Sequence, residues 1–381
     1  MKVILVNDTR IEENPGCHAT VDSLVGFLKT NLPKSKIESL PLGFGYDVLK
    51  NKKNLYITTS KNKFYKQALN KIFNVKFTRQ VNFKVWMQLV ENEVSELLKP
   101  FLKESDLVII NMEGTIHHNN IGSLALLSIA HASKLLNKPV AMVNGSYQEM
   151  DKKVSKKVLN IIDFLSFREV LSYEYVKKMK IKNKINLIYD FAFKADIFQH
   201  TDFILRKKEG IKYCLYTCGV LGVYPNQANG IDIFKIFSHI REIYELGYIP
   251  LFLQIEPKER IIVDQLNIKG IEVIRLNQYN YSNLGSVIKN FDLLITGRYH
   301  VGIFGLMSNV KTMFLPSNTH KIEGLLKMLE IHDSFIGSLK LKDLSIEELE
   351  QELILNNDDI NYFEKFLRNL NENKNHIKGL Y

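Results

Sequence analysis

The chain is poor in cysteine and in long apolar runs. Its 381 residues include only three cysteines, too few for a disulfide framework and typical of a reducing cytoplasm. No run approaches the ~18 consecutive apolar residues of a membrane-spanning helix. The first residues, MKVILVNDTR, predict a strand that enters a loop rather than a signal peptide. These absences disfavour secreted and integral membrane proteins.

Two phosphate-binding motifs are missing as well. The chain contains neither Gly-x-Gly-x-x-Gly nor Gly-x-x-x-x-Gly-Lys-Ser/Thr, which disfavours dinucleotide binding and the chemistry of Walker-type nucleotide sites. A metal site is also disfavoured, because His117 and His118 are adjacent rather than three or four residues apart, and no paired cysteine motif occurs. We therefore expect neither a metal nor a cofactor.

The chain has a formal net charge of +10, and acidic residues are missing from the whole stretch between Val48 and Val90. Within this stretch, Lys61–Asn74 has the apolar spacing of an amphipathic helix surrounded by lysines. Such a segment suits an anionic membrane surface or a charged acceptor, and a solvated lysine face is the alternative. We expect a cytoplasmic protein with peripheral association at the inner face of the membrane through Lys61–Lys71. Nucleic acid is not expected as a partner, because no recognised binding module occurs.

Two successive series of strands and helices are predicted from short apolar runs. The strands expected in the first series lie at 3–6, 107–111, 140–143, 164–167 and 185–189. Those expected in the second lie at 213–217, 248–253, 271–274, 293–295 and 312–315. The polar stretch 201–210 is the expected linker, between domains at 1–200 and 211–381, with a terminal helix that crosses back onto the first domain. The predicted fold class is α/β, with two Rossmann-like domains facing across a cleft.

Polar side chains follow one strand of the first series. Glu113, His117 and His118 come after the run at 107–111, and we expect them on a loop. Doubly wound folds bind their ligands at this edge of the sheet. Adjacent side chains rarely face the same way, so at most one of the two histidines is expected to face the site.

Two other positions of the first series suit an anionic ligand. Arg168 follows the strand at 164–167, where a guanidinium is a good fork for a carboxylate or phosphate; an ion pair with Glu169 or Asp190 is the alternative. Gly16 comes directly after Pro15 at a predicted helix start, and its missing side chain lets a ligand approach the backbone. A tight entry turn is the alternative reading for this glycine.

The second series leads to a predicted anion site. A helix is expected after residue 319, with apolar residues at i, i+3, i+4 and i+7, and with Asn318 or Thr319 as its N-cap. Cationic residues in a first turn are unfavourable unless something negative binds there. The strand at 293–295 leads to Arg298 and His300, a second cationic group expected at the same edge of the sheet. The residues expected around a shared anion are Arg298, His300, Asn318, Thr319, His320 and Lys321.

These stretches resemble the polysaccharide pyruvyltransferase family. The resemblance is carried by residues 297–300 (GRYH) followed by 317–325 (SNTHKIEGL), and by 14–20 (NPGCHAT), 113–118 (EGTIHH) and 166–169 (SFRE). It keeps its order over roughly residues 1 to 330. It implies a GT-B-like arrangement of the two domains. It also implies a transferase of surface polysaccharide or glycan biosynthesis, which moves pyruvyl from phosphoenolpyruvate to a sugar or lipid-linked glycan acceptor as a ketal.

The resemblance also implies roles for particular residues. His300 is the expected general acid, and Glu113 with His117 or His118 would serve the acceptor. The residues expected to bind the donor are Arg168, Arg298, Asn318, Thr319, His320, Lys321, Glu323 and Gly16. The chain departs from the family pattern at Met112, where a glycine is usual.

Two alternatives stay open. A metal-independent GT-B-type glycosyltransferase would place a UDP-, GDP- or CMP-sugar at the same helix N-terminus. Glu323 would then bond a ribose hydroxyl, and Glu113 or a neighbouring histidine would be the general base. A non-catalytic glycan-binding protein that kept the fold is the third hypothesis, and it predicts tolerance of changes at Arg298 and His300.

Overall fold

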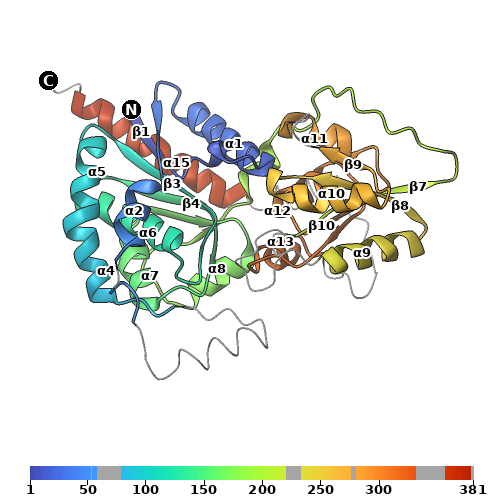
Figure 1. Ribbon diagram of the computed structural model, residues 1–381. Helices are drawn as coiled ribbons and strands as arrows, with labels where there is room; N and C mark the ends of the chain where they lie inside the picture. Colours follow the sequence, from blue (N-terminus) through green and yellow to red (C-terminus); the bar gives the residue numbers. More distant parts are fainter. Residues whose placement is uncertain (53, 58–78, 220–232, 276–279, 332–356, 379–381) are drawn as a thin grey trace. The chain divides into compact units, whose positions relative to one another are not determined.

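The computed structural model describes residues 1–52, 54–57, 79–219, 233–275, 280–331 and 357–378. Helices and strands alternate along these residues and form two parallel sheets (Figure 1). Two compact units contain them. The N-terminal unit comprises Met1–Asp8, Leu24–Asp190 and Leu355–Tyr381, and the C-terminal unit comprises Thr9–Ser23 and Phe191–Ile354. The expected fold class, two Rossmann-like α/β domains, is confirmed.

The bounds of these units differ from the domain limits expected from the sequence. The division falls between Asp190 and Phe191 rather than at 201–210, and residues 9–23 are counted with the C-terminal unit. Asp22 explains the second difference, because its carboxylate accepts hydrogen bonds from Tyr281 Oη at 2.8 Å and Arg10 Nη1 at 3.2 Å. Burial, reinforced by Asp22, raises the pKa of Tyr281 to about 12, so its hydroxyl remains a donor.

The sheet of the N-terminal unit has six strands in the order β2-β1-β3-β4-β5-β6, all parallel. These strands are β1 (Lys2–Val6), β2 (Lys36–Leu40), β3 (Leu107–His117), β4 (Val140–Gln148), β5 (Phe164–Phe167) and β6 (Asn186–Leu187). The chain order reverses between β1 and β3, which is where ligands bind in open α/β sheets.

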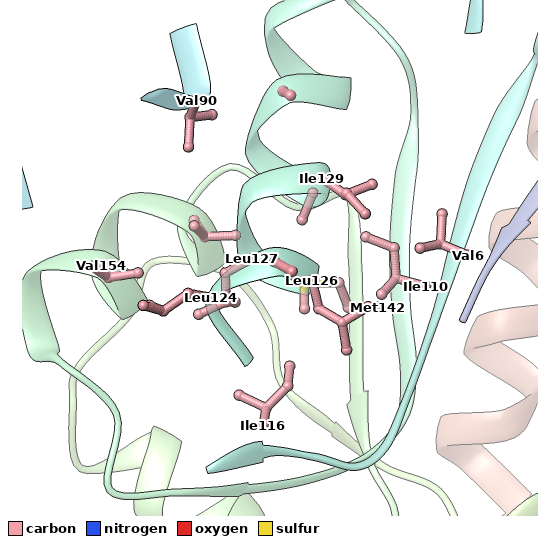
Figure 2. Close-up of a cluster of buried hydrophobic side chains, with 14 of the residues drawn as sticks. Val6, Val90, Ile110, Ile116, Leu124, Leu126, Leu127, Ile129, Met142 and Val154 are labelled. Atoms are coloured by element: carbon pink, nitrogen blue, oxygen red, sulfur yellow. The ribbon is translucent and has the colours of Figure 1, made fainter. Parts of the chain in front are cut away.

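Helices of this unit cover the sheet. They are the part of α1 (Pro15–Asn31) from Leu24 onward, α2 (Gly43–Lys50), α4 (Phe83–Leu89), α5 (Ser95–Leu102), α6 (Ile121–Leu135), α7 (Lys152–Leu159), α8 (Val170–Lys177) and α15 (Asn357–Lys378), with a π-helical turn at Val90–Val94. Helix α6 is apolar on most of its surface because it is buried between β3 and the helices α2 and α5. Its side chains meet those of the sheet in the core (Figure 2).

The terminal helix α15 packs on this same unit. Phe363 is fully buried and stacks on Phe164 and on Phe27, with ring centroids 4.4 and 5.4 Å apart. Asp359, in the first turn of α15, accepts a hydrogen bond from the backbone N–H of Leu187 at 2.7 Å. An aromatic stack and an edge-strand bond therefore join the end of the chain to β5 and β6.

The sheet of the C-terminal unit has five parallel strands in the order β11-β10-β7-β8-β9. They are β7 (Lys212–Thr217), β8 (Tyr248–Gln254), β9 (Val273–Arg275), β10 (Leu293–Thr296) and β11 (Thr312–Phe314). Its helices are α9 (Ile233–Glu245), α10 (Arg260–Ile268), α11 (Tyr281–Ile288), α12 (Tyr299–Met307) and α13 (Lys321–Met328). Short 3-10 turns lie at Thr9–Ile11, Phe191–Lys194 and Pro257–Glu259.

Three sequence predictions need comment. The run at 107–111 is only the first part of β3, which pairs with β4 as far as His117, so Glu113 and His117 lie on a strand and the predicted loop is wrong. Helix α13 is confirmed with its buried apolar stripe, but His320 occupies the N-cap position predicted for Asn318 or Thr319. The basic segment Lys61–Lys71 lies outside the described residues.

Candidate functional site

In the C-terminal unit, the chain leaves β10 at Thr296 and enters α12 through Arg298, whose backbone is extended (φ −97°, ψ 113°) at the N-cap position. The Oγ1 of Thr296 accepts a hydrogen bond from the backbone N–H of Arg298 at 3.0 Å. This turn places His300 in the first turn of α12, at the carboxyl edge of the sheet. Arg298 and His300 therefore lie where the sequence predicted them, one strand away from the segment that follows β11.

Arg298 is buried and held by two carboxylates. Its Nη1 donates to Glu256 at 2.8 Å, and its Nη2 donates to Glu259 at 2.6 Å. Burial raises the pKa of Glu259 even though Arg298 opposes the shift. The Nε of Arg298 has no hydrogen-bond partner among the described residues. The two glutamates fix the plane of the guanidinium and compensate its charge, so only its remaining N–H groups are left for a ligand.

His300 is held against the first turns of α1. Its Nε2 lies 3.2 Å from the Oγ1 of Thr20, a fully buried side chain. A methyl group on Gly16, one helical turn earlier, would overlap Cβ, Cγ and Nδ1 of the His300 side chain. Asn14 caps this helix, because its Oδ1 accepts from the N–H of Gly16 at 2.9 Å. The missing side chain of Gly16 therefore makes room for the histidine ring, a reason that the sequence did not suggest.

The predicted anion site at α13 has its residues in the first turn and just before it. His320 occupies the N-cap position of α13, where its side chain makes no capping hydrogen bond, and Lys321 is the first residue of the helix. Thr319 is buried, and its Oγ1 has no hydrogen-bond partner among the described residues. Asn318 Oδ1 accepts from the hydroxyl of Ser317 at 3.3 Å. Anion binding at this turn stays a prediction.

In the N-terminal unit, buried amides meet Glu113 at the carboxyl edge. Asn111 Nδ2 donates to Glu113 Oε1 at 3.0 Å, and Asn7 Nδ2 donates to the carbonyl of Asn111 at 2.8 Å. Asn7 follows β1, whereas Glu113 lies within β3 and Asn144 within β4. All three have left-handed backbones, with φ of 62°, 40° and 57°. For a glutamate this conformation is strained, and such strain is concentrated at functional sites.

Met112 occupies the position where the family pattern has glycine. A Cβ on Gly145 of the neighbouring strand would lie 2.7 Å from the Cβ of Met112. The glycine in β4 thus leaves the room that the larger side chain in β3 needs.

His117 and His118 contact each other through their rings, and the expectation that at most one of them faces the site stays a prediction. Their Nδ1 atoms are 3.0 Å apart, and His118 Nε2 lies 3.2 Å from Glu149 Oε2. His118 directly follows the last residue of β3 and has a left-handed backbone (φ 52°).

Arg168 lies at the end of β5 and is almost fully buried. Its Nη1 donates to Asp190 at 2.7 Å, and its Nε donates to Ser146 Oγ at 3.1 Å. Glu169 caps α8, accepting from the N–H of Leu171 at 2.8 Å. The ion pair left open by the sequence is therefore present, with Asp190 as the partner.

The structure thus gathers the predicted residues into two clusters. The α12 cluster contains Gly16, Arg298 and His300, and the β3–β4 cluster contains His117 and His118. Sequence reasoning missed the partners that hold these residues, namely Thr20, Glu149, Glu256 and Glu259. Thr20 lies in the stretch 14–20 that carries the family resemblance and follows Gly16 by one helical turn, so motif and spacing were both available signals. The glutamates gave none, because their partners lie far away in the sequence.

Comparisons with known proteins identify relatives at two levels. A model of the family described as polysaccharide pyruvyl transferase matches residues 14–319. A protein of Listeria monocytogenes assigned as a UDP-N-acetylglucosamine 2-epimerase has a similar structure, with a TM-score of 0.53, 14% identity, and coverage of 97% of this chain and 90% of that chain. The UDP-GlcNAc 2-epimerase of Methanocaldococcus jannaschii has a TM-score of 0.47 and 16% identity, with coverage of 93% of this chain and 99% of that chain. The first likeness confirms the GT-B-like fold class.

No curated protein matches the chain. In the part of the chain that the structure describes, no helix is long and apolar enough to cross a membrane. Within the same residues, no group of three or more His, Cys, Asp or Glu side chains is arranged to hold a metal ion.

Proposed function

Because the chain belongs to the polysaccharide pyruvyl transferase family, we propose that it transfers pyruvyl from phosphoenolpyruvate to two hydroxyls of a sugar. The product is a cyclic ketal, and the released group is phosphate. The acceptor is a sugar or a lipid-linked glycan of a surface polysaccharide, and the reaction takes place in the cytoplasm at the inner face of the membrane.

The α12 cluster supports the donor half of this proposal. His300 gives a proton to the methylene carbon of phosphoenolpyruvate, which leaves an oxocarbenium-like centre at C2. The first sugar hydroxyl adds to C2, phosphate leaves, and the second hydroxyl closes the ketal. The single observation that carries the proposal is the fixed position of His300, between Thr20 and the bare Cα of Gly16. A ring held this closely is oriented before the donor binds.

Cationic groups near His300 would hold the anionic donor. Arg298 lies two residues before it and keeps N–H groups beyond those that bind the two glutamates. His320, Lys321 and the backbone N–H groups at the start of α13 would bind the phosphate. Arg168 belongs to the donor set only by resemblance, since its fork already binds Asp190.

A nucleotide-sugar donor is the alternative that the fold keeps open. The Listeria monocytogenes protein of similar fold is named for a UDP-sugar, and Glu323 at the start of α13 would be placed for a ribose hydroxyl. A glycan-binding protein without catalysis is the last alternative. It requires that the positions of Arg298 and His300 tolerate substitution.

The test has two parts. Thermal shift with phosphoenolpyruvate against UDP-, GDP- and CMP-sugars identifies the donor class, and phosphate release with candidate acceptors measures turnover. His300→Asn keeps a hydrogen-bonding group, so we expect donor binding to persist while single-turnover transfer falls ~10²–10⁴-fold. An unchanged rate in a variant with the wild-type melting temperature removes His300 from the mechanism.

A further inference from the structure

Three side chains in the β3–β4 cluster form a line of hydrogen-bonding groups. Glu149 Oε2 lies 3.2 Å from His118 Nε2, and His118 Nδ1 lies 3.0 Å from His117 Nδ1. We propose that Glu149 is a positioning residue that orients His118, and that His118 in turn orients His117 as the base for the acceptor hydroxyl. This inference rests on the proposed function for its chemistry, and it assigns separate roles to the two histidines.

The carboxylate determines where the protons lie when both rings are neutral. An ionised carboxylate only accepts hydrogen bonds, so Nε2 of His118 must carry the proton that it shares with Glu149. A neutral imidazole has a single N–H, so Nδ1 of His118 is then an acceptor. The donor across the 3.0 Å contact must therefore be Nδ1–H of His117. It follows that Nε2 of His117 is unprotonated and able to take up a proton.

His118 is unsuited to be the base itself. Both of its ring nitrogens lie within hydrogen-bonding distance of side chains, His117 on one side and Glu149 on the other, and its side chain is 15% exposed. Removing a proton from a substrate would require it to give up one of these contacts. The arrangement follows the general logic of a base oriented by a third group.

The backbone around the line is built to hold it. His118, Asn119 and Glu149 all have left-handed backbones, with φ between 48° and 52°. Asn119 is buried, and its side chain accepts from the N–H of Asp151 at 2.7 Å and donates to the carbonyl of Arg79 at 2.7 Å. The N–H of His118 donates to the carbonyl of Gln148 at 3.1 Å. Residues keep such a strained backbone conformation only where the surrounding structure holds it in place.

The proton step balances within this line. The acceptor hydroxyl gives its proton to Nε2 of His117 as its oxygen bonds to C2 of the donor, and His117 becomes an imidazolium. Its positive charge is stabilised through His118 by the carboxylate of Glu149. Tyr175 is a titratable group near Glu149, and burial raises its pKa, so its hydroxyl stays neutral.

The first experiment needs no substrate. Histidine-selective ¹⁵N labelling of the whole chain, with His117→Asn and His118→Asn for assignment, follows both rings by NMR as the pH changes. Glu149→Gln removes the negative charge and keeps the size, so we expect the pKa of His118 to fall and the tautomer of His117 to become mixed. Glu104→Gln, which neutralises an exposed glutamate of the same unit, should change neither. Wild-type behaviour of both rings in Glu149→Gln overturns the proposal.

The second experiment measures transfer. Glu149→Gln should lower kcat by ~10-fold or more and move the acidic limb of its pH profile, with the KM for phosphoenolpyruvate unchanged and partial recovery in Glu149→Asp. A KM effect alone, or full activity in His117→Asn, contradicts the assigned roles. If the wild-type chain transfers no pyruvyl group to any acceptor, the proposed function fails, and the NMR titrations still decide whether the line of three side chains exists.

Discussion

Replacement of Gly16 by alanine should separate the role of this residue in positioning His300 from an ordinary helical role. Gly16 is the second residue of α1, and its φ is not left-handed. A glycine inside a helix normally costs ~0.5–1 kcal/mol relative to alanine. On that ground alone, Gly16→Ala would stabilise the protein.

The contact between Gly16 and His300 predicts instead that Gly16→Ala lowers activity and gives no gain in stability. The new methyl group would overlap three atoms of the histidine side chain, and relief of the overlap requires a shift of about 1 Å or more to reach ordinary contact distance. A misplacement of ~1 Å is enough to cost ~10²-fold in rate, while overpacking costs ~1–3 kcal/mol of stability. We therefore expect a folded protein with strongly reduced single-turnover transfer and a loosened contact between His300 and Thr20.

Gly26→Ala is the matched control. Gly26 lies in the same helix, and a Cβ built on it meets no atom within 4 Å. This variant should gain ~0.5–1 kcal/mol in urea unfolding and retain wild-type turnover. Both variants are compared by phosphate release and melting temperature. If Gly16→Ala behaves like Gly26→Ala in both assays, the close approach of Gly16 to His300 has no functional meaning.

The fold was largely predictable because its signals are local. Buried parallel strands appear as apolar runs, and four of the five strands in the C-terminal unit begin within one residue of the predicted position, as for β10 at Leu293. The prediction of β3 ended too early, because the strand continues through Glu113 and His117, polar residues that end an apolar run. Pairing with β4, which no local pattern reveals, extends it to His117.

The sequence suggested residues for the candidate site but not their contacts. Arg298, His300 and Gly16 carry the family pattern, whereas Glu256 and Glu259 come from a different strand–helix connection and reach Arg298 only in the folded chain. The orientation of a histidine ring depends on backbone angles such as the φ of 52° at His118. The amino-acid sequence around His118 does not indicate this angle. Partners and orientation therefore had to come from the structure.

Two buried groups give predictions on stability. Arg298→Met should lower the free energy of unfolding in urea by ~3–5 kcal/mol, because it removes the cation that pairs with the buried Glu256 and Glu259. Adding Glu259→Gln to this variant should recover part of the loss. If Arg298→Met were as stable as the wild type, the two ion pairs would not stabilise the fold. His131 is buried with neither ring nitrogen hydrogen-bonded among the described residues, and burial, aided by Lys157, lowers its pKa from 6.5 to about 4. The unfolded chain therefore binds this proton first, so stability present above pH ~6.5 is lost as the pH falls towards ~4, by about 3 kcal/mol. His131→Leu should flatten this part of the stability profile, measured by urea unfolding between these two pH values. An equal slope in variant and wild type would show that His131 is not the group responsible.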